Sequence, residues 1–92
     1  MFLVVAYDIA DDRRRVRVMK LLKGYGEHIQ ESVFECDLDA ARTRRLVRAL
    51  RALIDPQADN VRLYALCRQD VARIGQLGVP RPVQLARELI IV

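Results

Sequence analysis

The chain has 92 residues, of which 52% are hydrophobic and 30% charged, so it can form one small globular domain and is not a disordered chain. Its formal net charge at pH 7 is +4, and every basic residue except Lys20 and Lys23 is an arginine, a bias that fits either a phosphate-bearing partner or a GC-rich genome. No apolar run approaches the roughly 20 residues that span a membrane, and Cys36 and Cys67 lack metal-binding spacing, so we expect a cytoplasmic protein with buried, free thiols.

The first predicted element is a buried strand over residues 3–8, LVVAYD. A short apolar run that contains β-branched residues is typical of such a strand. An unpaired buried carboxylate is costly, so Asp8 is expected to reach the surface at the C-terminal end of the strand. Asp8 is therefore a candidate functional residue, and capping of the next helix is its structural alternative.

An arginine-dense helix should follow, from a cap at Asp11 or Asp12 to about Tyr25, where glycines end it. Residues 13–15, all arginine, occupy its first turn, although the helix dipole disfavours cations there. Cations at this position indicate a nearby anion, which is either a local aspartate or a bound phosphate. Arg17 continues the basic side of the helix opposite its apolar face.

Residues 27–37 indicate extended chain, either two short strands or one strand with a bulge, because no hairpin turn signal separates them. A second helix is predicted from about Ala40 to Ile54, capped by an aspartate that precedes it. Arg44 and Arg48 lie opposite its apolar stripe and form a second basic face. This face is either a contact surface for nucleic acid or ordinary solvated surface.

A further strand is predicted over residues 60–67, and an apolar strand over residues 88–92 closes the chain. The order of elements predicts an α+β, ferredoxin-like βαββαβ sandwich with an extra C-terminal strand. We expect a single domain over residues 1–92, with a core in 1–78 and a tail strand in 79–92. Because the apolar end needs an edge to pair with, in its own sheet or a partner's, we expect a homodimer.

Four segments of the sequence together resemble the small CRISPR-associated Cas-two family: VVAYDI, DDRRRVRVMKLLKGYG, HIQESVFEC and DNVRLYALC. The resemblance covers nearly the whole chain. It implies a ferredoxin-like homodimer that takes part in spacer acquisition with the Cas-one integrase. It also implies a nuclease that acts on RNA or double-stranded DNA with Mg²⁺ or another divalent cation.

By the same resemblance, Asp8 corresponds to the metal-binding and catalytic aspartate of the family. The positions that the family implicates around that site are occupied here by Tyr7, Arg15, Arg17 and Phe34. His28 stands where some members carry arginine. One aspartate cannot build a two-carboxylate site, so a twofold axis beside Asp8 would have to bring two copies together. The candidate nucleic-acid contacts are Tyr7, Arg13, Arg14, Arg15, Arg17, His28, Phe34, Arg44 and Arg48.

Different classes of function remain open at this point. The first is a Mg²⁺-dependent phosphodiesterase with Asp8 as metal ligand. The second is a DNA-binding scaffold without required chemistry, in which the arginines hold the phosphate backbone and the tail binds the Cas-one integrase. The third is a regulatory ferredoxin-like module that binds a metabolite, although the chain has no glycine-rich ligand loop. We favour the scaffold role in the cell, with nuclease activity in the isolated protein.

Overall fold

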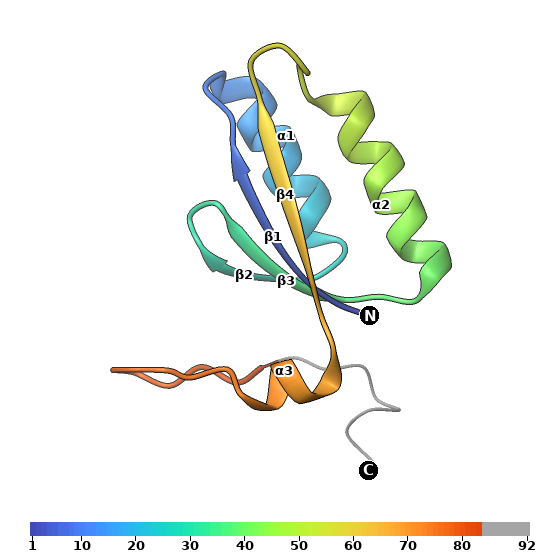
Figure 1. The fold of residues 1–92 in the computed structure, drawn as a ribbon. Coiled ribbons are helices and arrows are strands. Elements are labelled where there is room, and N and C mark those ends of the chain that lie inside the picture. Colours follow the sequence, from blue (N-terminus) through green and yellow to red (C-terminus); the bar gives the residue numbers. More distant parts are fainter. Residues whose placement is uncertain (84–92) are drawn as a thin grey trace.

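The structure, a computed structural model, describes residues 1–83 of the chain. Its strands and its two long helices follow one another in the order that the sequence predicts (Figure 1). A short helix after the last strand is an element that the sequence did not predict. They are β1 (Phe2–Asp8), α1 (Asp12–Lys23), β2 (Glu27–Gln30), β3 (Val33–Asp37), α2 (Ala40–Leu53), β4 (Asn60–Leu66) and α3 (Arg68–Ala72). The tail strand expected over residues 88–92 lies outside the described residues.

The four strands form one sheet in the order β2-β3-β1-β4, and every neighbouring pair is antiparallel. Helices α1 and α2 pack against each other and lie on the same side of this sheet (Figure 1). This arrangement confirms the predicted ferredoxin-like βαββαβ sandwich. No helix within residues 1–83 is long and apolar enough to cross a membrane.

The hydrophobic core lies between the sheet and the two long helices. Alternate residues of β1 point into it, because successive side chains of a strand face opposite sides. They pack with buried residues of β3, α1 and α2, in a cluster that includes Leu3, Val5, Tyr7, Val18, Leu22, Phe34, Cys36, Leu46 and Leu50.

The remaining residues of β1 face away from the helices, together with the residues paired to them on β3 and β4. We call this side of the sheet the open face. It consists of Phe2, Val4, Ala6, Asp8, Val33, Glu35, Asp37, Asn60, Arg62, Tyr64 and Leu66. Tyr64 is 47% exposed, and burial raises the pKa of Glu35.

Residues 27–37, for which the sequence left two alternatives open, form the two short strands β2 and β3. A two-residue turn at Glu31 and Ser32 joins them, and the pairing register shifts between His28 and Gln30. The first alternative, two short strands, is therefore correct, and the irregularity lies within the pairing of these strands. Gly26 precedes this hairpin in close contact with the backbone of β3, as a Cβ there would lie 2.2 Å from the carbonyl oxygen of Glu35.

Aspartates cap both long helices. The Asp11 carboxylate accepts a hydrogen bond from the Arg14 backbone N–H at 2.9 Å, and the Asp39 carboxylate accepts one from the Arg42 N–H at 2.7 Å. These are the N-cap positions of α1 and α2. Asp11, and not Asp8, therefore caps the first helix.

The two cysteines have different environments. Cys36 is completely buried, and burial raises its pKa to about 11. Cys67 is exposed, so the expectation of two buried thiols was wrong for this residue. The reason is its position, because Cys67 follows β4 at the edge of the sheet and precedes the short helix α3.

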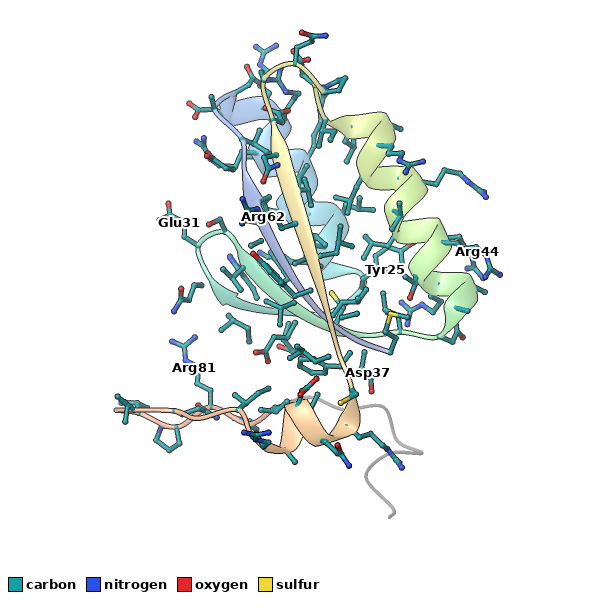
Figure 2. The ribbon with its side chains drawn as sticks, in the orientation of Figure 1. Tyr25, Glu31, Asp37, Arg44, Arg62 and Arg81 are labelled. Atoms are coloured by element: carbon teal, nitrogen blue, oxygen red, sulfur yellow. The ribbon has the colours of Figure 1, made fainter. Side chains whose placement is uncertain are left out.

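Beyond α3 the chain runs beside β2. The Arg81 side chain donates a hydrogen bond to the Ile29 carbonyl at 2.8 Å, and Figure 2 shows Arg81 reaching toward the sheet from this segment. The Gln76 side chain bonds both backbone groups of Arg81, and Gly78 between them has a φ of 86°. These contacts give residues 76–81 an ordered turn.

Candidate metal site and basic surfaces

Asp8 is the last residue of β1, and its side chain is exposed on the open face. The adjacent strand pairs it with Asn60, the first residue of β4. Directly opposite residues of an antiparallel pair have Cβ atoms about 4.5–5.5 Å apart and project from the same face. On the other side, the Tyr7 backbone N–H donates to the Ser32 carbonyl at 3.1 Å, which keeps the strand paired up to this end.

The carboxylate of Asp8 has no hydrogen-bond or ion-pair partner within residues 1–83. In this respect it differs from the other aspartates of the described chain, each of which has one. These are Asp11, Asp12, Asp37, Asp39, Asp55, Asp59 and Asp70. Within the described residues Asp8 thus makes no polar contact, and both of its oxygens are available to a ligand.

An exposed carboxylate with free oxygens fits a divalent cation such as Mg²⁺, which prefers hard oxygen ligands and retains several waters. No group of three or more histidine, cysteine or acidic side chains that could hold a metal occurs among residues 1–83. The site of one protomer therefore offers a partial coordination shell. Waters, a phosphate or a second copy of the chain would have to complete it.

A cluster of rings lies behind Asp8 on the helix side of the sheet. Tyr7 is 5% exposed, and Phe34 is 0% exposed and stacks on His28 with ring centroids 4.5 Å apart. The Tyr7 hydroxyl donates to the carbonyl of Glu31 at 3.1 Å, and His28 Nε2 lies 3.1 Å from the same oxygen. Figure 2 shows Glu31 at the turn between β2 and β3. Burial raises the pKa of Tyr7.

These contacts indicate that the three rings support the structure around Asp8. Tyr7 and Phe34 belong to the hydrophobic core, so a nucleic acid cannot reach either ring in this arrangement. Together they hold the turn between β2 and β3 next to the strand end that carries Asp8. His28 is the one exposed ring of this cluster.

Two of the arginines at the start of α1 are engaged within the protein. Arg14 Nε donates to the Asp59 carboxylate at 2.8 Å, and the side chain of Asp59 is completely buried. Arg15 donates to the Ile9 carbonyl at 3.0 Å and also pairs with Asp12. The anions expected near the arginines at the start of α1 are therefore aspartates of the chain itself.

The other candidate arginines of the two helices are free to contact a ligand. Arg13 and Arg17 on α1 and Arg44 and Arg48 on α2 are all exposed. Within residues 1–83 their side chains have no hydrogen-bond or ion-pair partner. Figure 2 shows Arg44 on the outer side of α2, pointing away from the sheet. The helix layer thus presents unpaired cations to solvent.

Two residues near Asp8 were not predicted as site residues. Asn60 is paired to Asp8, and Arg62 is paired to Ala6, so both share the open face with Asp8. The Arg62 guanidinium donates to the Tyr64 hydroxyl at 3.3 Å on the same face. The period-two pattern of NVRLYAL could have placed Asn60, Arg62 and Tyr64 on one side of a strand, but not beside Asp8.

The sequence pattern of the family described as CRISPR associated protein Cas2 matches residues 1–74. A CRISPR-associated endoribonuclease Cas2 of Chloroflexus aurantiacus is 40% identical over 93 residues, covering 100% of both chains. A CRISPR-associated endonuclease Cas2 of Thermus thermophilus is 48% identical over 82 residues, covering 88% of this chain and 91% of the relative. The crystal structure of Streptococcus pyogenes Cas2 at pH 6.5 superposes with a TM-score of 0.76 at 32% identity, covering 85% of this chain and 100% of that one. Sequence and fold agree, and the chain belongs to the Cas2 family of CRISPR-associated proteins.

Proposed function

We propose that this Cas2-family protein is a dimeric nucleic-acid-binding scaffold in CRISPR adaptation, where it works with the Cas-one integrase. We further propose a divalent-cation-dependent phosphodiesterase centre at Asp8 that cuts RNA or double-stranded DNA. The free carboxylate of Asp8 is the observation that carries this second part. The relatives named endoribonuclease and endonuclease support it.

The open face supports the dimer. The two long helices cover only one side of the sheet, while Val4, Ala6 and Val33 remain half-buried and Tyr64 is 47% exposed on the other. A sheet normally buries its apolar face against a second layer, and a second copy of this face would supply one. A twofold axis near the strand ends would also bring two Asp8 carboxylates to the same place.

The residues of the chain would have different roles at such a centre. Asp8 would hold the cation, which when bound polarises a phosphodiester and activates water. The ring cluster of Tyr7, His28 and Phe34 would keep the strand end in position. The free arginines of α1 and α2 would hold the phosphate backbone outside the reacting group.

The exposed arginines also support the scaffold as a function without chemistry. Four arginines on two adjacent helices, without partners within residues 1–83, would contact the phosphates of duplex DNA in a sequence-independent way. In this second candidate function Asp8 would be dispensable. Loss of Asp8 therefore separates the two proposals.

The decisive variant is Asp8→Asn, which removes the anionic ligand and keeps the shape of the side chain. We expect Mg²⁺-dependent cleavage of RNA and duplex DNA to fall to background. The metal-free stability should change by less than about 0.5 kcal/mol, since the side chain is exposed and unpaired. In the dimer the metal-free stability of the variant should equal or exceed that of the wild type, because the two nearby Asp8 carboxylates of the wild type repel each other. DNA binding, measured by fluorescence anisotropy, should persist.

Asp11→Asn is the matched control, because asparagine is itself a good N-cap and the change removes a nearby exposed charge. It should leave cleavage intact. Undiminished cleavage by Asp8→Asn would refute the phosphodiesterase centre. If spacer acquisition with Cas-one continues in Asp8→Asn, this result supports the scaffold function without chemistry. Acquisition that stops while the variant still folds, dimerises and binds DNA would rule out a scaffold without chemistry.

A further inference from the structure

Asn60 is the residue of the open face whose chemistry the proposed function does not yet use. It begins β4 opposite Asp8, and its side chain is exposed. Within residues 1–83 its amide has no hydrogen-bond partner. Asn60 therefore lies next to a free carboxylate with its own polar group free as well.

The structural tasks that an asparagine often has at this position are performed by its neighbour. Asparagine at a loop–strand junction commonly bonds nearby backbone groups. Here the carboxylate of Asp59 accepts the Asp55 backbone N–H at 2.8 Å and pairs with Arg14. The amide of Asn60 is thus left without a role in closing the loop between α2 and β4.

The geometry of the pair suits a cation. Opposite residues of an antiparallel pair project from one face with Cβ atoms about 4.5–5.5 Å apart, close enough for two side-chain oxygens to reach one ion between them. Carboxylate and amide carbonyl oxygens are both ligands of hard divalent cations. The amide oxygen adds a donor without adding the repulsion that a second carboxylate of the same chain would bring.

We propose that Asn60 is the second protein ligand of the divalent cation held by Asp8, through its side-chain amide oxygen. Strands β1 and β4 of one protomer then each contribute one oxygen. This inference rests on the proposed metal site at Asp8, and it makes Asn60 a determinant of cation affinity.

Direct cation binding to the full-length protein tests this proposal without reference to cleavage. Mn²⁺ is the probe, because electron paramagnetic resonance measures the free ion in a titration. We expect Asn60→Ala to weaken Mn²⁺ binding about tenfold, which corresponds to about 1.4 kcal/mol. Asn60→Asp should bind Mn²⁺ more tightly than the wild type, since it supplies a second anionic oxygen.

The matched control is Gln57→Ala, which removes another exposed amide from the neighbouring loop. The Gln57 backbone N–H donates to the Asp55 carboxylate at 2.9 Å, and this bond survives the change. Gln57→Ala should bind Mn²⁺ like the wild type. Asn60→Ser provides a second truncation in case the alanine variant does not fold.

Thermal unfolding supplies an independent readout. Without metal, Asn60→Asp should unfold at a lower temperature than the wild type, because its carboxylate lies beside that of Asp8. Saturating Mn²⁺ should raise its Tm by more than it raises the Tm of the wild type. Asn60→Ala should show a smaller rise than the wild type.

The possible results separate this inference from the proposed function. If Asp8→Asn abolishes Mn²⁺ binding while Asn60→Ala, Asn60→Ser and Asn60→Asp all bind like the wild type, the role of Asn60 is refuted and the Asp8 site stands. If the wild type binds no Mn²⁺ at millimolar concentration, the metal site itself fails and Asn60 has no ligand to hold. Weaker Mn²⁺ binding by Asn60→Ala and Asn60→Ser, together with tighter binding by Asn60→Asp, supports both the metal site at Asp8 and the role of Asn60 as its ligand.

Discussion

The buried carboxylate of Asp59 joins α1 to the start of β4. It accepts hydrogen bonds from the Arg14 side chain at 2.8 Å and from the Asp55 backbone N–H at 2.8 Å. These bonds, that from Arg14 first, lower the pKa of Asp59. An aspartate in the unfolded chain has a pKa of about 3.9. The stabilisation of the folded state by the ionised Asp59 is therefore fully present above that pH, and it is lost as the pH falls through the lower folded-state pKa.

We therefore expect the Tm of the wild type to fall steeply below about pH 4, as followed by circular dichroism. Asp59→Asn should unfold at a lower temperature at pH 7 but lose less stability on acidification. Asp12→Asn, which removes an 86% exposed carboxylate, is the control and should follow the wild-type curve closely. Parallel curves for Asp59→Asn and the wild type would show that this ion pair does not control acid stability.

At the scale of elements, the passage from α1 to β2 depends on a glycine. A Cβ at Gly26 would lie 2.2 Å from the carbonyl oxygen of Glu35 and 2.6 Å from Sγ of Cys36. The first of these atoms belongs to the backbone of β3, so the sheet or the helix end would have to move. We expect Gly26→Ala to cost about 1–3 kcal/mol or more, as overpacking does, in a urea titration.

Gly75→Ala is the matched control for this change, because no atom of residues 1–83 other than those of its chain neighbours lies within 4 Å of a Cβ at that position. It should leave the free energy of unfolding within about 0.5 kcal/mol of the wild type. Equal stabilities for the two alanine variants would mean that β3 can shift to admit a methyl group. The close packing of α1 against the β2–β3 hairpin would then not depend on Gly26.

At the scale of the whole molecule, the helix layer should bind nucleic acid mainly through charge. Each phosphate contacted on duplex DNA contributes about −0.9 to the slope of log K against log salt concentration. The double variant Arg13→Ala/Arg17→Ala should flatten this slope by up to about two units, and so should Arg44→Ala/Arg48→Ala. The control Arg68→Ala/Arg73→Ala removes the same charge from the two ends of the α3 segment and should change the slope less.

Fluorescence anisotropy over a salt series measures these slopes. If all three double variants flatten the slope equally, the effect is one of net charge and not of a defined surface. If none of them changes it, the exposed arginines of α1 and α2 are ordinary solvated surface. The wild-type affinity should also be nearly the same for unrelated duplex sequences.

The proposed dimer is also tested at the scale of the whole molecule. We expect sedimentation velocity at micromolar concentration to give the mass of two chains. Tyr64→Lys places a charge on the open face and should shift the protein toward monomer. Leu63→Lys is a closely matched control, since Leu63 is 38% exposed on the opposite side of the same strand, and it should remain dimeric. A monomeric wild type would refute the dimer.

Local patterns explain how much of the fold could be predicted. Strand β1 and helices α1 and α2 follow from apolar periodicity and aspartate caps, which act over a few residues. The hairpin between β2 and β3 could not be resolved, because its turn at Glu31 and Ser32 has no glycine signal. The division into a core over 1–78 and a tail over 79–92 stays a prediction.

The sequence by itself determined the fold class, the family resemblance and Asp8 as the residue at the end of the first strand. Only the tertiary structure decided which charged groups are free. Arg13 and Arg14 are adjacent in sequence, yet Arg14 is bound to Asp59, 45 positions away, and Arg13 has no partner within residues 1–83. In the same way, strand pairing alone brings Asn60 beside Asp8. The physical reason is that periodicity and capping are local, whereas the partners of a side chain are set by contacts between segments distant in the chain.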